Sequence, residues 1–369
     1  MSDLDALLGM LSREPDIGAA ELRAWDVADR YLLDLAAERF PEALRGEVVV
    51  VDDTHGALAL GVSALGASTV RVHPDSIIAR RALAANAQRL GVASPEQAPL
   101  AELVTPATTL ALVRLPKSLD RLDAIARALA HRASPDLVVL AGNRVKHMTP
   151  TQNPVLQAAF ERVDVAPARQ KARVLIASGP QQVSPAESVR AETSAEVDVV
   201  AHPGVFAGAN LDIGTRVLIG TFDSLPDFDV AVDLACGSGV LATLLARHRP
   251  RARVIASDVS EIAVASTRET ALANGIEVEV HQDDGLGFLP DESVDLVVLN
   301  PPFHSGSTVT LELAERLFAD AARVLRPGGE LRAVWNSHLG YRPILERLVG
   351  PTRQLVRTPK FTVTASAKR

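Results

Sequence analysis

The chain has 369 residues, 47% of them hydrophobic, and a formal net charge of −7. This length is typical of two domains, each large enough for its own core. The charge argues against a general nucleic-acid binder, and no apolar run approaches the length of a membrane span. No signal-peptide pattern is visible and Cys236 is the only cysteine, so we expect a cytoplasmic protein without disulfides.

The first half alternates predicted helices and strands, which is typical of a parallel sheet flanked by helices. In chain order the patterns predict helix 20–39, strand 47–52, helix 57–66, strand 69–72, helix 76–90, strand 109–114, helix 119–132, strand 136–140, helix 154–162 and strand 172–177. A stretch rich in Ser, Pro, Gln and Glu follows. We therefore expect a first domain at 1–178, a linker at 179–195 and a second domain at 196–369.

The second half repeats this order of elements. It predicts helix 213–224, strand 229–233, helix 240–247, strand 253–257, helix 261–274, strands 277–281 and 294–299, helix 311–325 and strand 330–335. Residues 76–92 and 260–276 align without a gap and share Ser, Ile, Ala and Gly at four positions. Such self-similarity indicates two copies of one doubly wound α/β fold.

A glycine loop follows the strand at 229–233. Asp233, Ala235, Gly237 and Gly239 lie on it, in an Asp-x-x-x-Gly-x-Gly pattern. Glycines let the backbone approach a ligand closely, and the helix that follows offers unpaired N–H groups to a carboxylate. Because the third glycine of the dinucleotide pattern is missing, the loop favours S-adenosylmethionine over NAD as the cofactor.

Acidic residues follow the next two strands. Asp258 stands where an acid can accept both ribose hydroxyls of a nucleoside, although it could also share a helix N-cap with Ser260. Asp283 and Asp284 follow the third strand, and Asp284 is the slightly better candidate to accept from the adenine amino group. A loop acid that caps a turn is an equal alternative for either one.

The sequence Asn300-Pro-Pro-Phe303 follows the strand at 294–299. Two prolines after an Asn make a rigid, extended turn. This turn can present the Asn300 side-chain oxygen and the Pro301 carbonyl as two fixed acceptors, with Phe303 as a stacking face. That arrangement suits a planar NH2 group, so these three residues are the catalytic candidates; the alternative is a structural turn with a buried Phe.

Here the sequence resembles the ribosomal RNA guanine-N2 methyltransferases. Asn300-Pro-Pro-Phe303, His304, Gly204-Val-Phe206, Leu211-Asp-Ile-Gly214 and Asn336-Ser-His-Leu339 carry the resemblance. It implies two tandem Rossmann-like class I methyltransferase domains, the N-terminal one degenerate, and methylation of a guanine N2 in ribosomal RNA. It also implies ribosomal RNA or a ribosomal subunit as the partner. The segments 142–147 and 171–173 look more like the large-subunit form than the small-subunit form.

The first copy departs from its twin at the positions where chemistry is expected. Asp52-Asp-Thr-His-Gly56 replaces the two-glycine loop, and Arg114-Leu-Pro-Lys117 replaces Asn300-Pro-Pro-Phe303. We expect this copy neither to bind the cofactor nor to transfer methyl. Arg114 and Lys117 could contact a phosphate backbone, together with the excess of basic residues at 140–177. The alternative is that this copy is only a structural scaffold. The segment 347–369 is also basic, with no acid.

His304 is a candidate substrate contact with a positional role, because methyl transfer from a sulfonium does not require a strong base. No Cys/His cluster has zinc spacing, so we expect no metal. One alternative function is methylation of a protein glutamine amide, although such enzymes usually have Tyr at the position of Phe303 and lack a degenerate twin. The other is a non-catalytic RNA-binding scaffold. The sequence indicates nothing about oligomeric state.

Overall fold

The computed structural model describes residues 3–16, 22–301 and 308–369, with 308–310 described by their backbone alone. Its contacts divide the chain into two compact units, Met1–Glu187 and Ser188–Arg369. The boundary lies within the stretch 179–195 that we expected to be a linker. Part of that stretch forms a strand, β8 (Val189–Glu192), which pairs antiparallel with β9 (Asp198–Ala201).

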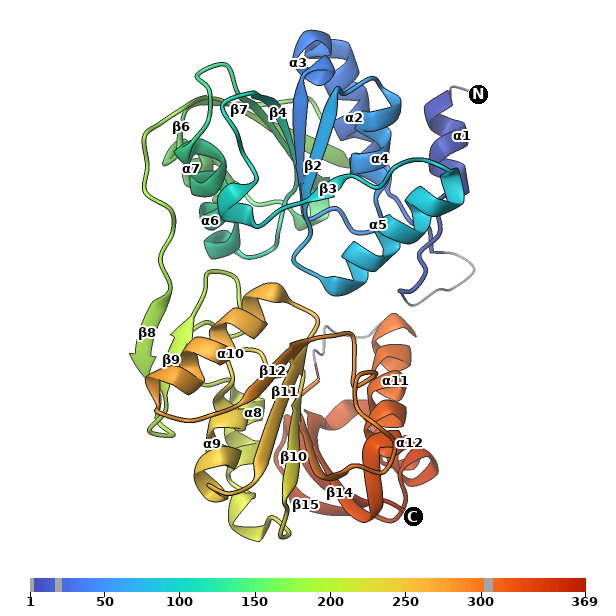
Figure 1. Cartoon of the computed structure of the whole chain (residues 1–369), viewed down its shortest axis with the longest axis vertical. Helices are drawn as coiled ribbons and strands as arrows, with labels where there is room; N and C mark the ends of the chain where they lie inside the picture. The colour runs from blue at the N-terminus through green and yellow to red at the C-terminus, as the bar shows by residue number, and fades with distance from the viewer. Residues whose placement is uncertain (1–2, 17–21, 302–307) are drawn as a thin grey trace. The chain divides into compact units, whose positions relative to one another are not determined.

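The N-terminal unit is built on a seven-stranded sheet in the order β3-β2-β1-β4-β5-β7-β6 (Figure 1). All neighbours are parallel except those of β7, which is antiparallel to β5 and β6. The strands are β1 (Glu47–Val51), β2 (Thr69–His73), β3 (Glu96–Gln97), β4 (Thr108–Arg114), β5 (Val138–Arg144), β6 (Phe160–Val165) and β7 (Ala172–Pro180). The helices are α1 (Asp3–Met10), α2 (Val27–Arg39), α3 (Pro41–Arg45), α4 (Ala57–Ala64), α5 (Ile77–Leu90), α6 (Leu119–His131) and α7 (Gln152–Gln157).

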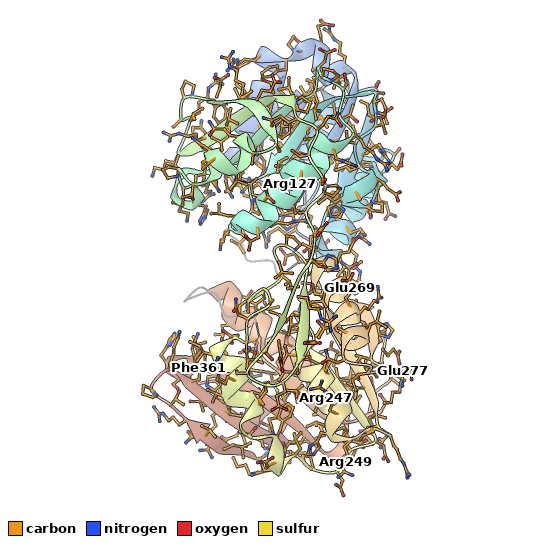
Figure 2. All side chains as sticks on the ribbon, turned by 90° about the vertical axis from the view of Figure 1, so that its left-hand side faces the viewer. Arg127, Arg247, Arg249, Glu269, Glu277 and Phe361 are labelled. Atoms are coloured by element: carbon orange, nitrogen blue, oxygen red, sulfur yellow. The ribbon has the colours of Figure 1, made fainter. Side chains whose placement is uncertain are left out.

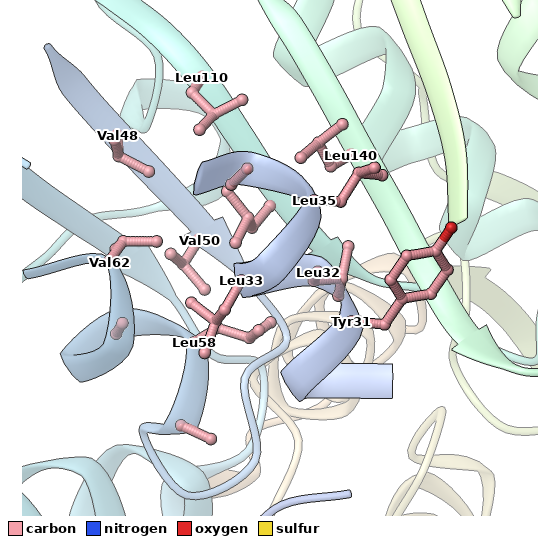
Figure 3. Packing of buried hydrophobic residues seen from close by; sticks show 14 of the residues in the cluster. Tyr31, Leu32, Leu33, Leu35, Val48, Val50, Leu58, Val62, Leu110 and Leu140 are labelled. Atoms are coloured by element: carbon pink, nitrogen blue, oxygen red, sulfur yellow. The ribbon is translucent and has the colours of Figure 1, made fainter. Parts of the chain in front are cut away.

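Helices cover both faces of this sheet. On one face, α2 and α4 pack against alternate side chains of β1, β4 and β5; on the other face, α6 and α7 do so. Figure 3 shows the first of these cores, with labelled side chains Tyr31, Leu32, Leu33, Leu35, Val48, Val50, Leu58, Val62, Leu110 and Leu140. Each fully buried Leu contributes about 1.5–3 kcal/mol relative to an exposed one, so these two layers fix the sheet that positions the loops at its edge.

The C-terminal unit has the same architecture, with strands in the order β12-β11-β10-β13-β14-β16-β15. Its strands are β10 (Val230–Leu234), β11 (Arg253–Asp258), β12 (Glu279–Gln282), β13 (Val294–Leu299), β14 (Leu325–Asn336), β15 (Thr352–Arg357) and β16 (Phe361–Ala367). Its helices are α8 (Ile213–Ile219), α9 (Val240–His248), α10 (Glu261–Ala273), α11 (Thr308–Val324) and α12 (Arg342–Leu348). Short 3-10 turns complete the two units (Leu100–Glu102, Val145–His147, Phe222–Ser224 and Ser337–Leu339).

The two strand orders correspond one to one, and in each unit only the sixth strand of the order is antiparallel to its neighbours. This confirms the prediction of two tandem Rossmann-like α/β folds. The carboxyl ends of β10, β11 and β13 meet at one edge of the second sheet, which is where ligands bind in doubly wound folds.

The β8–β9 hairpin belongs to the C-terminal unit. The side chain of Arg247, labelled in Figure 2, donates from Nη1 to the carbonyl of Glu196 at 2.7 Å and from Nη2 to Oδ1 of Asn274 at 2.7 Å. His202, just after β9, contacts Glu269 of α10 at 2.8 Å. These bonds attach the segment around β9 to α9 and α10.

The sequence patterns missed several elements and misplaced one helix. Helix 154–162 is instead α7 followed by the strand β6, and α12, β15 and β16 were not predicted. The helix predicted at 20–39 begins only at Val27, with Asp26 as its N-cap, and residues 22–26 are not helical. Among the helices that the structure describes, none is both long and apolar enough to cross a membrane.

Candidate active site

The loop between β10 and α9 has the backbone geometry that its glycines allow. Ala235, Gly237 and Gly239 have φ angles of 61°, 55° and 80°, in the left-handed region. A Cβ atom at Gly239 would lie 2.9 Å from Cα of Thr267, so a side chain there would push α10 away. At Gly237 a Cβ would meet no atom within 4 Å, so the loop faces open space at that point.

Asp233 is fully buried beneath this loop. Its Oδ2 accepts a hydrogen bond at 2.9 Å from the backbone N–H of Ala242, in the first turn of α9. Burial raises the pKa of Asp233 to about 8, and the charge of Asp258 contributes to the rise. The structure therefore places this predicted cofactor-binding residue under the loop, where it holds the start of α9, while Ala235 and Gly237 line the cavity above.

Asp258 ends β11 at the same edge of the sheet. Its Oδ2 accepts from the backbone N–H of Gly237 and its Oδ1 from that of Ser260, both at 3.0 Å. Both roles that the sequence left open are therefore compatible with its position. The carboxylate supports the glycine loop and the start of α10, and a carboxylate has about four acceptor sites, enough for a ribose hydroxyl as well.

The two acids after β12 have different surroundings. Asp283 is buried, and its backbone N–H donates to the carbonyl of Asp258 at 3.0 Å. Asp284 is half-buried, and its Oδ2 lies 3.5 Å from Nη1 of Arg316 on α11. Both lie at the edge that the glycine loop and Asp258 share.

Asn300 follows β13 and faces the start of α8. Its Nδ2 donates to Oγ1 of Thr215 at 2.9 Å and to Oδ2 of Asp212, the N-cap of α8, at 3.2 Å. The next residue, Pro301, is buried. Phe303 and His304, the other candidates of this turn, lie outside the described residues.

A cavity brings the predicted groups together. Its lining includes Phe206, Asp212, Thr215, Ala235, Gly237 and Asn300. The strand ends therefore place the glycine loop and the amide of Asn300 around one space. Phe206 and Asp212 stand in the two segments that carry the family resemblance, but no role was predicted for them or for Thr215. Phe206 is 58% exposed at this cavity.

In the N-terminal unit the equivalent loop shares part of its backbone geometry but has different chemistry, and Thr54 at the position of Gly237 has no positive φ. Asp52 and Gly56 have φ angles of 58° and 88°, matching Ala235 and Gly239. The buried carboxylate of Asp53 accepts from the backbone N–H groups of Gly56, Leu58 and Ala59 at 2.9–3.2 Å. These N–H groups at the start of α4 are therefore already bonded to a side chain of the protein and are not available to a ligand.

The acid after the second strand is also missing in this unit. Val51 pairs with His73 in the first sheet, as Leu234 pairs with Ser257 in the second. The residue at the position of Asp258 is therefore Pro74, which has no acceptor for a ribose hydroxyl. Both observations agree with the expectation that the first copy does not bind the cofactor.

Arg114 occupies the position of Asn300, because Val113 pairs with Val51 as Leu299 pairs with Leu234. Its guanidinium lies 2.6 Å from a carboxylate oxygen of Asp26 and 2.6 Å from one of Asp29. These carboxylates raise the pKa of Arg114 despite its burial. This geometry favours the scaffold alternative for Arg114, because both carboxylates engage its guanidinium.

Lys117, by contrast, is exposed. Lys117 follows β4, and Arg144, Lys146 and His147 lie at or just after the end of β5; because these strands are parallel neighbours, the four residues lie at the same carboxyl edge of the first sheet. Desolvation and the charges of Lys146, Lys117 and Arg144 lower the pKa of His147. Lys171 adjoins these residues, since its carbonyl accepts from the backbone N–H of Val145 at 2.8 Å. We refer to Lys117, Arg144, Lys146, His147 and Lys171 as the basic cluster, in which Arg144 also pairs with Asp26 at 3.1 Å.

A larger cavity lies at the same edge of the N-terminal unit, but its charged walls pair with one another. Arg30 contacts Asp34 at 2.7 Å, and His55 contacts Asp16 at 3.0 Å. Over the described ranges, no group of three or more His, Cys, Asp or Glu could hold a metal ion. Cys236 is buried in the cofactor loop, and burial raises its pKa well above the usual value, so it is not a reactive thiolate.

Comparison with known proteins accounts for both units. Residues 196–365 match the family model described as Methyltransferase small domain, and residues 4–182 match the RLMG N-terminal domain. The ribosomal RNA large subunit methyltransferase G of Streptomyces coelicolor is 39% identical, over 97% of this chain and 98% of that protein. The protein of the same name from Pseudomonas entomophila is 35% identical, over 100% and 98% of the two chains.

A solved structure has the same two-unit fold. It is the 16S rRNA N2 methyltransferase RsmC of T. thermophilus, in complex with AdoMet and guanosine. It superposes with a TM-score of 0.78 over 93% of this chain and 92% of that chain, at 24% identity.

Proposed function

Because the chain belongs to the family of the ribosomal RNA large subunit methyltransferase G, we propose that its C-terminal unit methylates N2 of a guanine in large-subunit ribosomal RNA. The chain is an S-adenosylmethionine-dependent methyltransferase of this family. The observation that supports the site is the convergence of the glycine loop, Asp258 and Asn300 at one edge of the second sheet. We place the catalytic domain at 196–369 and the degenerate copy at 1–178.

The residues at this edge fit an adenosylmethionine. The loop presents open backbone at Gly237, and Asp258 offers carboxylate acceptors beside it for the ribose. Ala235 and Gly239 shape the same loop, Asp233 stabilises it from below, and Asp284 is our candidate for the adenine amino group. When bound, the cofactor supplies a methyl group on a positively charged sulfur.

The protein's contribution to the reaction is alignment. Attack must be in line with the breaking sulfur–carbon bond, from roughly 3–3.5 Å. We propose that the Oδ1 of Asn300 and the carbonyl of Pro301 accept the two N–H bonds of the amine, which directs its lone pair at the methyl group. As the new bond forms, the nitrogen gains positive charge, which these two oxygens stabilise before a proton leaves to solvent. Phe303 and His304 would contact the base from the same turn.

The substrate must be an unstacked guanine, because its amine cannot reach a recessed methyl donor inside a helix. We propose that the basic cluster of the N-terminal unit contacts the RNA backbone, with Lys117 as one of its members. A protein that modifies ribosomal RNA acts where ribosomes are assembled, so we propose a cytoplasmic location with ribosomal RNA or a ribosomal subunit as partner.

The test is methyl transfer from labelled cofactor to four substrates in parallel: unmodified large-subunit RNA, small-subunit RNA, large ribosomal subunits and a release factor. We expect label in the large-subunit RNA, recovered as N2-methylguanosine after digestion. Label in the release factor alone would favour the glutamine-amide alternative. Cofactor binding without transfer to any substrate would favour the scaffold alternative.

A further inference from the structure

The orientation of the Asn300 amide is dictated by its neighbours. Asp212 is a carboxylate, and of the two ends of an amide only the nitrogen can donate to it. Nδ2 uses its two N–H bonds on Asp212 and Thr215, at 3.2 and 2.9 Å. Oδ1 is therefore the acceptor end of the amide, with its position fixed by the two bonds of Nδ2.

Asp212 is itself fixed in place. Its Oδ2 also accepts from the backbone N–H of Thr215 at 3.1 Å, as the N-cap of α8. The helix start approaches closely because the residue between them is glycine. A Cβ atom at Gly214 would lie 3.0 Å from Oδ2 of Asp212, 3.2 Å from Cε1 of Phe361 and 3.4 Å from Oδ1 of Asn300. Figure 2 labels Phe361, which begins β16.

In the N-terminal unit the start of a helix is linked to the end of a strand in the same way, but by different side chains. Asp26 is the N-cap of α2 and Asp29 lies three residues later, as Thr215 follows Asp212. Both carboxylates contact Arg114, the counterpart of Asn300. An arginine has only donors, so this version holds the strand end to the helix but offers no acceptor to an amine. The C-terminal unit keeps this link between helix and strand, and Asn300 adds a side-chain oxygen whose direction the link fixes.

We propose that Asp212 and Thr215 are positioning residues for methyl transfer, which hold the Asn300 amide so that its Oδ1 faces the amine of the target base. This inference rests on the proposed function. The negative charge of Asp212, on the nitrogen side of the amide, also polarises it and makes Oδ1 a stronger acceptor for the N–H bonds of the nitrogen that becomes positive.

The closing experiment compares Thr215→Val, Thr215→Ser and Asp212→Asn in the full chain. Single-turnover transfer is measured at saturating unmodified large-subunit RNA, with the affinities for S-adenosylhomocysteine and RNA measured separately. We expect Thr215→Val to lower the rate about tenfold and Asp212→Asn by up to about a hundredfold, the range that small misplacements cost. Both affinities should change little, and Thr215→Ser, which retains the hydroxyl, should restore most of the rate.

Asp29→Asn in the N-terminal unit is the matched control. Asp29 is the counterpart of Thr215, so this variant changes the equivalent position in the other unit. We expect a lower melting temperature with an unchanged rate at saturating RNA. A Thr215→Val rate equal to wild type, or an equal loss in Thr215→Val and Thr215→Ser, would overturn the proposal.

A second readout needs no substrate. In protein labelled with 15N-asparagine, the side-chain NH2 signal of Asn300 is assigned from its absence in Asn300→Ala. We expect this signal to shift and its solvent exchange to accelerate in Thr215→Val, while an unchanged signal contradicts the inference. If wild type methylates no RNA, the proposed function fails, but the NH2 signal still decides whether Thr215 orients the amide.

Discussion

Asp53 in the N-terminal loop is the counterpart of Cys236 in the C-terminal loop. Each directly follows a non-glycine residue of positive φ, Asp52 in the first loop and Ala235 in the second. The carboxylate fills the first turn of α4 with three backbone hydrogen bonds. The buried thiol of Cys236 instead bonds Oγ1 of Thr267 at 3.2 Å and leaves the loop above it open. Asp53 for Cys236, together with Thr54 for Gly237, thus separates a closed loop from a cofactor loop.

The first prediction is that only the C-terminal unit binds the cofactor. In calorimetry, residues 188–369 should bind S-adenosylhomocysteine about as tightly as the full chain, and residues 1–187 should show no heat of binding. Asp53 and Pro74 account for the difference. Saturable binding to a folded 1–187 fragment would contradict the assignment of a degenerate copy.

The second prediction concerns Asp258. Asp258→Ala should weaken cofactor binding by roughly 1–3 kcal/mol, because charged hydrogen bonds to the ribose and the support of Gly237 are both removed. Ser260→Ala is the control, since it removes the side-chain bond to the N–H of Ala263 and leaves the carboxylate intact. Equal decreases of affinity in the two variants would reduce Asp258 to a cap of α10.

The third prediction separates chemistry from cofactor binding at Asn300. Asn300→Ala removes one of the two acceptors aimed at the amine, and a small misplacement in such a step can cost about a hundredfold in rate. Affinity for S-adenosylhomocysteine should stay nearly intact. Single-turnover transfer at saturating RNA measures the rate, and a wild-type rate would show that the active site lies elsewhere.

The fourth prediction is that RNA binding depends on salt and on the basic cluster. The double variant Lys117→Gln/Lys146→Gln should bind the RNA more weakly and with a shallower salt dependence, by about one unit of slope for each phosphate that a lysine no longer neutralises. Arg132→Gln is the control, because Arg132 follows α6 at the opposite edge of the sheet. Affinity that is flat with salt would exclude binding to phosphates as the main contribution.

The fifth prediction follows from the buried Asp233, whose pKa burial raises to about 8 from an ordinary value of 3.8. Between these values the folded protein holds a proton that the unfolded chain releases, so the free energy of unfolding should fall as pH rises toward 8 and then level off. Thermal melts of the cofactor-free protein measure this. Asp233→Asn cannot ionise and should flatten the decline, whereas Asp223→Asn, which removes an exposed carboxylate, should leave it unchanged.

Much of the fold could be predicted because its central strands have continuous apolar runs. β10 and β13 are buried along nearly their whole length and were expected within one or two residues. β16 was missed although apolar and hydroxyl side chains alternate along it. Both of its faces are buried, and on the hydroxyl face Oγ of Ser366 bonds Oγ1 of Thr352 at 2.9 Å and Thr362 bonds Ser337 at 2.9 Å. This period-two alternation is typical of a strand, so the sequence did contain a signal for β16. What the alternation could not show is that the hydroxyl face is buried as well.

The candidate site was predictable where glycines and prolines restrict the backbone, as at Gly239 and Asn300. Asp212 was noticed only as part of a segment that resembles the family, and Thr215 not at all, because the role we propose for both acts through the amide of another residue. The internal repeat contains a signal for them. Residues 25–33 and 211–219 align without a gap and share Asp, Arg and Leu at Asp26/Asp212, Arg30/Arg216 and Leu32/Leu218. Together with the correspondence of Arg114 and Asn300, this alignment indicates that the start of the helix and the end of the strand lie together in both units.

The insertion of the last strand of each unit between two earlier ones affects how the chain folds. β7 lies between β5 and β6, and β16 lies between β14 and β15. The edge strands β6 and β15 therefore cannot pair with the sheet until β7 and β16, which follow them in the chain, have been synthesised. The first sheet can close at Pro180, fifty residues before β10 begins at Val230. On a ribosome the N-terminal unit can thus finish folding before its look-alike strands emerge, which limits strand exchange between the two copies during synthesis.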